Sequence, residues 1–316
     1  MNAIFRVLFL LLATLFFTGC EILKPEPDIN IPDEAFLNAL IDLGIDTNED
    51  GAISPSEAED IPHLDVFERG ISDMTGIEAF INLQRLNCLK NQLTGLDVSQ
   101  NTALTDLHCG DNQLSSLDVS NNTALVNMTC EGNQLSQLDV SNNHALEYLL
   151  CNANQLTNLD FSNNTALTAL YCVSNQLTSL NVSNNTAMVT LSCALNQLTN
   201  LDISNITSLT VLFCYSNQLT SLDFSHNTAL TELYCAINQL TSLNVSNNTA
   251  LTVLHCFTNP LTSLDISNNV SLINIQIREM PYLNEVCVWE TPFPPDGVIL
   301  DITNSPNINI TTECSK

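Results

Sequence analysis

Residues 104–114 read LTDLHCGDNQL, and close variants of this stretch return every 21 positions through most of the chain. The clearest marker of the period is a cysteine in its middle. Nine cysteines follow one another at this constant spacing, namely Cys88, Cys109, Cys130, Cys151, Cys172, Cys193, Cys214, Cys235 and Cys256. The next step reaches Ile277, so another apolar residue also satisfies the position. A fixed period of this length predicts a solenoid in which each repeat packs against its neighbours.

The first half of the repeat resembles the leucine-rich-repeat signature L-x-x-L-x-L-x-x-N-x-L, with cysteine in place of the third leucine. The resemblance covers residues 83–277 and is to the short-repeat, internalin-like branch of bacterial surface proteins. It implies a right-handed leucine-rich-repeat solenoid with a parallel β ladder on its concave face. The second half of each repeat lacks a helical period, so we expect a largely non-helical convex side.

Each repeat is expected to contribute one short strand, near residues 107–109 and their equivalents. Alternation along a strand directs Leu107 and Cys109 inward and directs the residues around them to the opposite face. A thiol in that column could be a metal ligand, a redox or disulfide group, or a core residue. A straight column does not converge on one metal centre, and an odd number of cysteines cannot all pair. Because free cysteine is among the most buried residue types, a core position is the favoured interpretation.

Two polar columns accompany the leucines. The first offers an inward amide to turn backbone groups that no strand partner can reach, which predicts a structural ladder. Its members are Asn91, Asn112, Asn133, Asn154, Asn175, Asn196, Asn217, Asn238 and Asn259. The second column is mostly acidic and contains Asp97, Asp118, Asp139, Asp160, Asn181, Asp202, Asp223, Asn244 and Asp265. It could be a cation-binding stripe or an Asx-turn, and the turn is favoured because asparagine keeps its hydrogen bond without the charge.

The N-terminal residues 1–20 read MNAIFRVLFLLLATLFFTGC, an apolar run too short to cross a bilayer, followed by small residues. This pattern is typical of a secretory signal. The ending FFTGC resembles the lipobox of bacterial lipoproteins, which implies removal of residues 1–19 and a lipid anchor on Cys20. The alternative is an ordinary signal cleaved nearby. Residues 20–32 then form a tether, and the protein is expected to be exported and lipid-anchored at the outer membrane or cell surface.

Residues 46–57, DTNEDGAISPSE, resemble the twelve-residue EF-hand loop, in which oxygen ligands surround Ca²⁺ and a sixth-position glycine permits the bend. The ligands in this chain would be Asp46, Asn48, Asp50, the Ala52 carbonyl, Ser54 and Glu57. A helical apolar period precedes the loop, so residues 33–62 are expected to form a small helical cap. Ca²⁺ would be a structural cofactor of this cap; the alternative is an acidic turn that binds nothing.

Both ends of the repeat array are expected to be capped, because an open solenoid end exposes its core. Residues 63–82 read as a degenerate first repeat, with Leu64 lying one position further from Leu86 than the period requires. Residues 278–316 lack the period and form the predicted C-terminal cap. This segment holds Cys287 and Cys314, and in an oxidising compartment such a pair predicts a disulfide.

The outward strand columns lie outside the repeat consensus and change along the chain. Early repeats are polar there, whereas later ones gather aromatic rings: Tyr171, Phe213, Tyr215, Tyr234, His255 and Phe257. A contiguous exposed aromatic patch usually marks a contact site. The alternative is cross-strand packing without a partner. The sequence therefore predicts protein interaction or adhesion through the concave face, with glycan capture by stacking on sugar rings as the second hypothesis.

The net charge of the 316-residue chain is −27. Without a basic surface to neutralise phosphates, we expect no nucleic-acid partner, and binding to anionic lipid is disfavoured. No nucleophile is accompanied by a base, and His108 and His255 share a column but lie seven repeats apart. We therefore expect a non-catalytic, monomeric protein that contacts membranes only through its lipid anchor.

Overall fold

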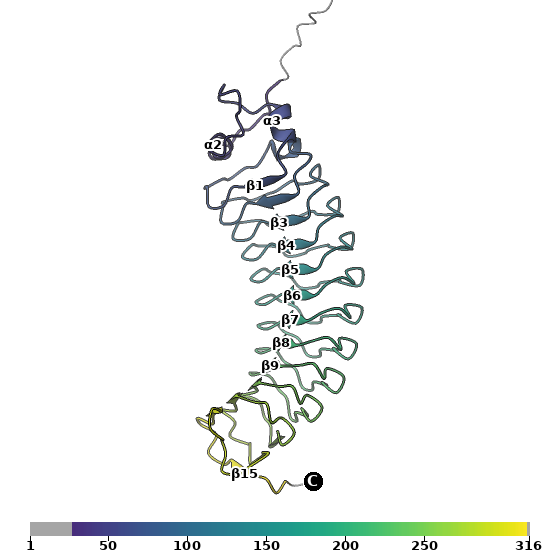
Figure 1. The fold of residues 1–316 in the computed structure, drawn as a ribbon, viewed down its shortest axis with the longest axis vertical. Helices are drawn as coiled ribbons and strands as arrows, with labels where there is room; N and C mark the ends of the chain where they lie inside the picture. The colour runs from purple at the N-terminus through teal and green to yellow at the C-terminus, as the bar shows by residue number, and fades with distance from the viewer. Residues whose placement is uncertain (1–26, 315–316) are drawn as a thin grey trace, which may run out of the picture.

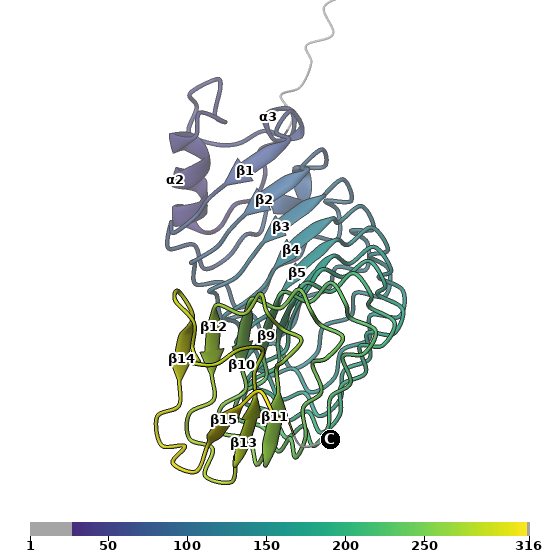
Figure 2. The ribbon, with the colours of Figure 1, turned by 60° about the horizontal axis from the view of Figure 1, so that its bottom comes forward.

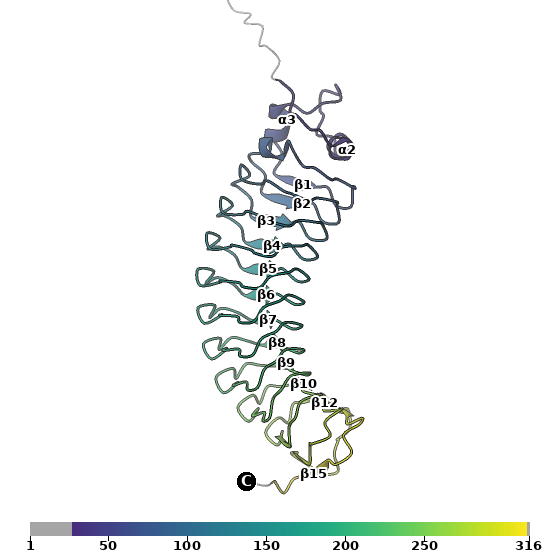
Figure 3. The same cartoon turned by 180° about the vertical axis from the view of Figure 1, so that it is seen from behind.

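The computed structural model describes residues 27–314, so the expected signal sequence and Cys20 lie outside the described residues. The described chain forms a curved stack of turns, with a small helical unit at one end and a cap at the other (Figure 1). Figure 3 shows the same curvature from behind. Three short helices lie near the N-terminal end: α2 (Glu34–Asp42), α3 (Pro55–Glu59) and the 3-10 helix η1 (Ile77–Ala79). None of the described helices is long and apolar enough to cross a membrane.

The strands are three residues long and run parallel to their partners. They are β1 (His63–Asp65), β2 (Arg85–Asn87), β3 (Asp106–His108), β4 (Asn127–Thr129), β5 (Tyr148–Leu150), β6 (Ala169–Tyr171), β7 (Thr190–Ser192), β8 (Val211–Phe213), β9 (Glu232–Tyr234), β10 (Val253–His255), β11 (Ser263–Asp265), β12 (Asn274–Gln276), β13 (Glu285–Cys287), β14 (Ile299–Asp301) and β15 (Asn309–Thr311). A 12-stranded sheet runs from β1 to β10 and then through β12 and β14. The other three strands form a second sheet, visible beside the end of the first in Figure 2.

The register between central strands follows the period, since each residue pairs with its equivalent in the next repeat. Leu107 of β3, for example, pairs with Met128 of β4. Inward leucines and cysteines alternate with outward residues, as predicted. The strand spans Asp106–His108 rather than 107–109, because the chain turns out of the sheet soon after the cysteine. The backbone N–H of Cys109 still donates across the ladder, to the Thr129 carbonyl oxygen.

All nine ladder cysteines are buried and carry free thiols. They lie with the inward leucines in one core that runs the length of the solenoid. Burial raises the pKa of the Cys88 and Cys193 thiols to about 12, so both stay protonated at neutral pH. A buried, protonated thiol is neither a metal ligand nor a redox nucleophile. The interpretation of this column as core is therefore confirmed.

The predicted asparagine ladder joins consecutive repeats. The Asn112 amide nitrogen donates to the carbonyl oxygens of Cys88 and Cys109, at 3.0 and 3.1 Å. Its amide oxygen accepts a hydrogen bond from the Leu93 N–H at 3.0 Å. The same bonding recurs further along the column, as at Asn238. One side chain per repeat thus satisfies backbone groups of two successive turns, which confirms the structural role.

A second asparagine ladder, which sequence analysis did not single out, lies at the opposite end of each repeat. The Asn143 amide nitrogen donates to the carbonyl oxygens of Val119 and Asn122, at 3.1 and 2.9 Å. Its fully buried equivalents are Asn101, Asn122, Asn164, Asn185, Asn227, Asn248 and Asn269. Ile206 interrupts the series, and Asn227 still donates to its carbonyl oxygen. The signal in the sequence is the asparagine that recurs at this position in every full repeat but the one with Ile206.

The acidic column forms Asx-turns. The Asp118 carboxylate accepts a hydrogen bond from the Ser120 N–H at 2.9 Å, and the Asn181 amide oxygen accepts one from Ser183 at 3.1 Å. Hydrogen bonds from Ser120 hold the pKa of Asp118 below its ordinary value. Because aspartate and asparagine make the same bond, the turn accounts for the column without a bound cation.

At the N-terminal end, β1 pairs with β2 and places Leu64 beside Leu86. The step between these two paired residues is one residue longer than the period of the repeats. The helical unit is tied to this first turn by Asp33, whose side chain caps α2. The second oxygen of the Asp33 carboxylate accepts hydrogen bonds from the N–H and hydroxyl of Ser72, at 2.8 and 2.7 Å. One side chain therefore both starts the helix and attaches it to the ladder.

The ladder also continues beyond residue 277, which the period did not predict. Strand β14 pairs with β12 and places Ile299 beside Asn274, a longer step than the period of the repeats. Ser305 takes the place of a ladder asparagine in this last turn. Its hydroxyl donates to the Ile277 carbonyl oxygen at 2.8 Å and accepts from the Met280 N–H at 2.9 Å. The C-terminal cap is thus built as further, longer turns of the solenoid.

Candidate functional site

The outward side chains of the main sheet line the concave face and change in character along it. The early strands carry polar or charged groups such as Arg85, Asp106 and His108. From β6 onward the face holds the six predicted contact residues, Tyr171, Phe213, Tyr215, Tyr234, His255 and Phe257, each partly exposed. The aromatic end of the face therefore lies in the C-terminal half of the solenoid.

Three of these rings form one continuous stack across β8, β9 and β10. Tyr234 lies parallel to Phe213, with ring centroids 4.4 Å apart and an interplanar angle of 14°. On the other side His255 lies nearly perpendicular to Tyr234, with ring centroids 4.8 Å apart and an interplanar angle of 85°. The stack is a cross-strand arrangement of the kind that sequence analysis left open as an alternative. The three rings pack against one another and each stays partly exposed.

Of the other three predicted residues, Tyr171 and Phe257 contact groups outside this stack. Tyr171 is separated from Phe213 by the buried Ser192 of β7 and contacts Tyr148 instead, at 5.6 Å between centroids. Tyr148 is not among the predicted contact residues; it pairs with Ala169 in the strand ladder and reaches Tyr171 diagonally. Phe257 lies under the Arg278 guanidinium, 4.0 Å from ring centroid to Cζ. The face thus holds one central stack with aromatic groups at both sides of it.

The electrostatics of the stack favour binding over proton transfer. The Tyr234 hydroxyl donates to the Glu232 carboxylate at 3.0 Å, and burial, followed by that bond, raises the pKa of Tyr234. Burial also lowers the pKa of His255, which disfavours its cationic form. Both rings are therefore neutral at pH 7. The face offers π surfaces and single hydrogen-bonding groups, without an activated nucleophile in the stack.

The predicted calcium loop wraps around its own side chains. The Asp46 carboxylate accepts hydrogen bonds from the Asp50 and Gly51 N–H groups, at 3.2 and 2.9 Å. The Glu57 carboxylate reaches back from α3 and accepts from the Thr47 N–H and hydroxyl, both at 2.7 Å. Gly51 has a φ of +84°, which a residue with a side chain rarely adopts. Both ends of the loop are therefore joined through Glu57.

Ser54 and Glu57 also form a capping box at the start of α3, a structural role that sequence analysis did not assign. The Ser54 N–H donates to Glu57 at 2.9 Å, and this bond leads the interactions that lower the pKa of Glu57 to about 2. The donor set fits Ca²⁺ in chemistry, because three carboxylates, an amide, a hydroxyl and a main-chain carbonyl occur in one loop. The loop carries four acidic residues and no basic one between positions 46 and 57.

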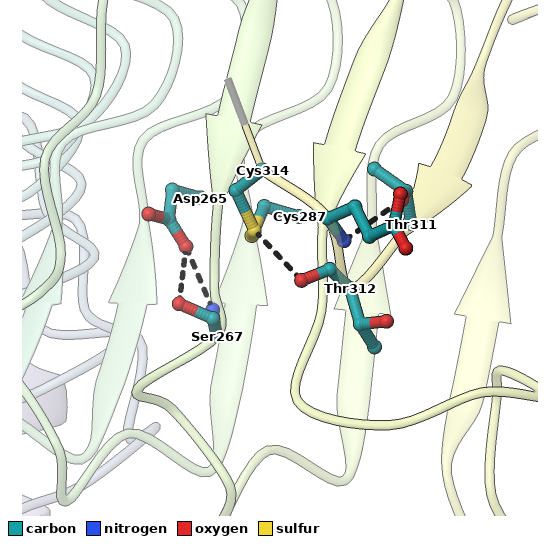
Figure 4. The surroundings of a disulfide bond; sticks show 7 residues. Asp265, Ser267, Cys287, Thr311, Thr312 and Cys314 are labelled. Atoms are coloured by element: carbon teal, nitrogen blue, oxygen red, sulfur yellow. Dashed lines mark hydrogen bonds between the residues drawn. A yellow bond between two sulfur atoms is a disulfide. The ribbon is translucent and has the colours of Figure 1, made fainter. Parts of the chain in front are cut away.

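The C-terminal cap contains a disulfide between Cys287 of β13 and Cys314, with Cα atoms 5.5 Å apart. It ties the chain after β15 back to the second sheet (Figure 4). Asp265 lies beside the two sulfur atoms, and its carboxylate accepts hydrogen bonds from the N–H and hydroxyl of Ser267, at 2.9 and 2.6 Å. Because the sulfur atoms are bonded to each other, neither is a thiolate ligand, and the group offers no metal site.

Solved structures share this architecture. The functional domain of InlJ from Listeria monocytogenes, described as including a cysteine ladder, superposes with a TM-score of 0.84 at 36% sequence identity. The alignment covers 90% of the present chain. The chain is an internalin-like leucine-rich-repeat solenoid. It spans 64% of the length of the InlJ chain, just under two thirds.

Two more distant structures match this internalin-like solenoid in fold alone. The internalin InlF from Listeria monocytogenes has a TM-score of 0.66 at 20% identity, covering 93% of this chain and 99% of its own. The ectodomain of the Arabidopsis thaliana receptor kinase GASSHO1/SCHENGEN3, in complex with CASPARIAN STRIP INTEGRITY FACTOR 2, has a TM-score of 0.62 at 21% identity. That match covers 74% of this chain and 34% of the ectodomain. No protein-family model matches the chain, and a search of curated proteins found no match.

Proposed function

We propose that this internalin-like solenoid is a non-catalytic protein of the cell envelope that binds a protein ligand through the aromatic half of its concave face. The observation that carries the proposal is the change along one face from polar groups to the Phe213–Tyr234–His255 stack. Aromatic side chains are enriched in the energetically dominant parts of interfaces. The structural neighbours, internalins and a receptor ectodomain in complex with its factor, support a binding role over a catalytic one.

The proposal is tested by comparing the wild type with a Phe213→Ala/Tyr234→Ala/Phe257→Ala variant in a pull-down from cell-surface extract. We expect the variant to lose the wild-type partner. A Phe67→Ala variant is the matched control, because Phe67 is an exposed ring of the N-terminal turn, 5.3 Å from the Lys90 amine. If the triple variant retains every partner of the wild type, the concave face is not the binding site.

Glycan capture is the second candidate function, favoured by the partly exposed aromatic side chains of the same face. A flat aromatic ring can stack on a sugar ring as well as on a peptide side chain. A glycan array with the same variants separates the two candidates. If the wild type binds a sugar, the triple variant does not, and the pull-down yields no protein partner, the ligand is a glycan rather than a protein.

A lipid anchor on Cys20 is the proposed link to the envelope, at the outer membrane or cell surface. It rests on the signal-like residues 1–19 and the FFTGC ending. Intact-mass measurement of the protein from the membrane fraction tests it, since a lipidated mature chain is lighter by residues 1–19 and heavier by its acyl chains. A chain whose first residue lies beyond Cys20 would contradict the anchor. The proposed mature protein is a monomer.

Ca²⁺ is the proposed structural cofactor of the N-terminal unit, held by Asp46, Asn48, Asp50, Ala52, Ser54 and Glu57. A bound cation would offset the repulsion among the four acidic residues of the loop. Calorimetric titration of the wild type and Asp46→Ala with CaCl₂ is the test. Glu49→Ala is the matched control, since it removes the same charge from a position that is not a ligand. Equal binding heats for the wild type and Asp46→Ala would contradict the proposal.

A further inference from the structure

The turn that follows each ladder cysteine contains a residue in the left-handed conformation. In the full repeats this is the second residue after the cysteine, and its φ lies between +50° and +63°. The column consists of Lys90, Asp111, Gly132, Ala153, Ser174, Leu195, Ser216, Ile237, Thr258 and Glu279. Its geometry is fixed by the fold, because the backbone N–H bonds to the next repeat, as from Leu195 to the Tyr215 carbonyl oxygen at 3.0 Å.

Leu195 and Ile237 are unexpected members of this column. The left-handed conformation favours glycine and asparagine, and it is least favourable for bulky or β-branched side chains such as isoleucine. Burial does not compensate them, because Leu195 is 45% exposed and Ile237 is 44% exposed. Neither backbone preference nor core packing therefore explains why large apolar residues occupy these two turns.

The two residues alternate with aromatic residues of the neighbouring column. Where the residue after the cysteine is the buried Ala194 or Ala236, the next residue is Leu195 or Ile237. Where it is Tyr215 or Phe257, the next residue is the small, polar Ser216 or Thr258. Four consecutive repeats thus place one large apolar side chain each at the border of the concave face. We call Leu195, Tyr215, Ile237 and Phe257 the apolar ridge.

The charge around the ridge indicates the chemistry of its complement. The sequence holds no lysine or arginine between residues 91 and 277, and the whole chain carries a net charge of −27. The Arg278 guanidinium covers Phe257 at the end of the ridge and is paired with Asp301 at 3.3 Å. The repeats that carry the ridge contain the acidic residues Asp202, Asp223 and Glu232 and no lysine or arginine, so the ridge matches a ligand that is both apolar and basic.

We propose that the apolar ridge binds a basic polypeptide segment whose apolar side chains contact Leu195 and Ile237. This proposal rests on the proposed function of the concave face and names both the class of ligand and two contact residues outside the strand columns. The side chains of the ridge supply the apolar contact. The negative field of the solenoid supplies attraction to the lysine or arginine groups of the ligand.

Fluorescence anisotropy with three synthetic peptides tests the proposal: alternating Leu–Lys, alternating Ser–Lys and alternating Leu–Glu. The full-length wild type is expected to bind the Leu–Lys peptide at least about tenfold more tightly than the other two. Leu195→Ser/Ile237→Ser is expected to weaken that binding by about tenfold or more. Serine occupies the same left-handed turn at Ser174 and Ser216, so the variant should fold and unfold at the wild-type temperature or above.

Val270→Ser is the matched control, because Val270 is 63% exposed and lies outside the ridge. Equal binding of the Leu–Lys and Ser–Lys peptides, or no Leu–Lys binding by the wild type, overturns the proposal. Unchanged binding by Leu195→Ser/Ile237→Ser also overturns it. Leu195→Ser/Ile237→Ser could keep the pull-down partner that the Phe213/Tyr234/Phe257 variant loses. In that case the ridge is not the binding site for the partner, while the proposed function of the concave face stands.

Discussion

Asn154 illustrates how a single side chain connects two repeats. Its amide nitrogen donates to the carbonyl oxygens of Cys130 and Cys151, at 3.0 and 3.2 Å, and its amide oxygen accepts from the Leu135 N–H at 3.0 Å. An alanine would leave these buried groups without partners. We expect Asn154→Ala to lower the free energy of unfolding by about 3 kcal/mol. Urea denaturation followed by circular dichroism measures the change.

Asn163→Ala is the control at the same scale. Its amide also donates to the preceding repeat, to the Ser141 carbonyl oxygen at 3.2 Å, but this bond is exposed. Water can replace an exposed partner, so we expect a loss of about 0.5 kcal/mol or less. Similar losses for both variants would show that burial is not what makes the inner ladder important.

The pH dependence of the N-terminal unit follows from Glu57. Hydrogen bonds lower the pKa of Glu57 from its ordinary 4.5 to about 2, so the folded state favours the ionised form. That contribution is complete above pH 4.5 and is lost as the pH falls through about 2. We expect pepsin to cleave the segment of α2 and α3 increasingly as the pH falls between these values. Glu57→Gln, which cannot titrate, should be cleaved more readily at pH 4.5 and show a flatter pH profile.

The disulfide is expected to stabilise the C-terminal cap without stabilising the central repeats. It closes a loop between Cys287 and Cys314, and such a constraint is worth about 3–4 kcal/mol. Trp289 is the one tryptophan of the chain and contacts Phe293, with centroids 5.0 Å apart, so its fluorescence reports on the cap. We expect Cys287→Ser/Cys314→Ser to lower the midpoint of the fluorescence transition more than that of circular dichroism.

Reduction of the wild type should reproduce this shift, and the reductant should have no further effect on the double variant. A shift of equal size in both signals would mean that the cap and the repeats unfold as one unit.

The sequence predicts the elements best where one requirement recurs in every repeat. The leucine and cysteine columns repeat the same burial, so period alone predicts the core and the register. β14 could not be predicted in this way, because its step from β12 is longer than the period and Ser305 replaces the ladder asparagine. The aromatic columns could be placed on the concave face. Their separation by Ser192 also follows from the period, whereas the left-handed conformation of Leu195 depends on how the turn folds.

The whole molecule behaves as a one-dimensional array, since each strand of the repeats pairs only with its two neighbours. Deletion of residues 130–150 removes one period and joins Thr129 to Cys151 in phase. We expect this deletion variant to fold, with a circular dichroism spectrum like that of the wild type and a modestly lower melting temperature. Deletion of residues 130–139 is the control. This shorter deletion is not a whole period, so the inward leucines and cysteines after it no longer align with those before it. We expect it to lower the melting temperature more than the deletion of residues 130–150 does.

The absence of lysine and arginine between residues 91 and 277 has a consequence for the durability of the molecule. Trypsin-like proteases cut after lysine or arginine, and none occurs between Lys90 and Arg278. The exposed turns of the solenoid, where enzymes usually nick a folded chain, therefore contain no target for this class of enzyme. Even when it is unfolded, the repeat array therefore leaves tryptic digestion as one long fragment from residue 91 to residue 278.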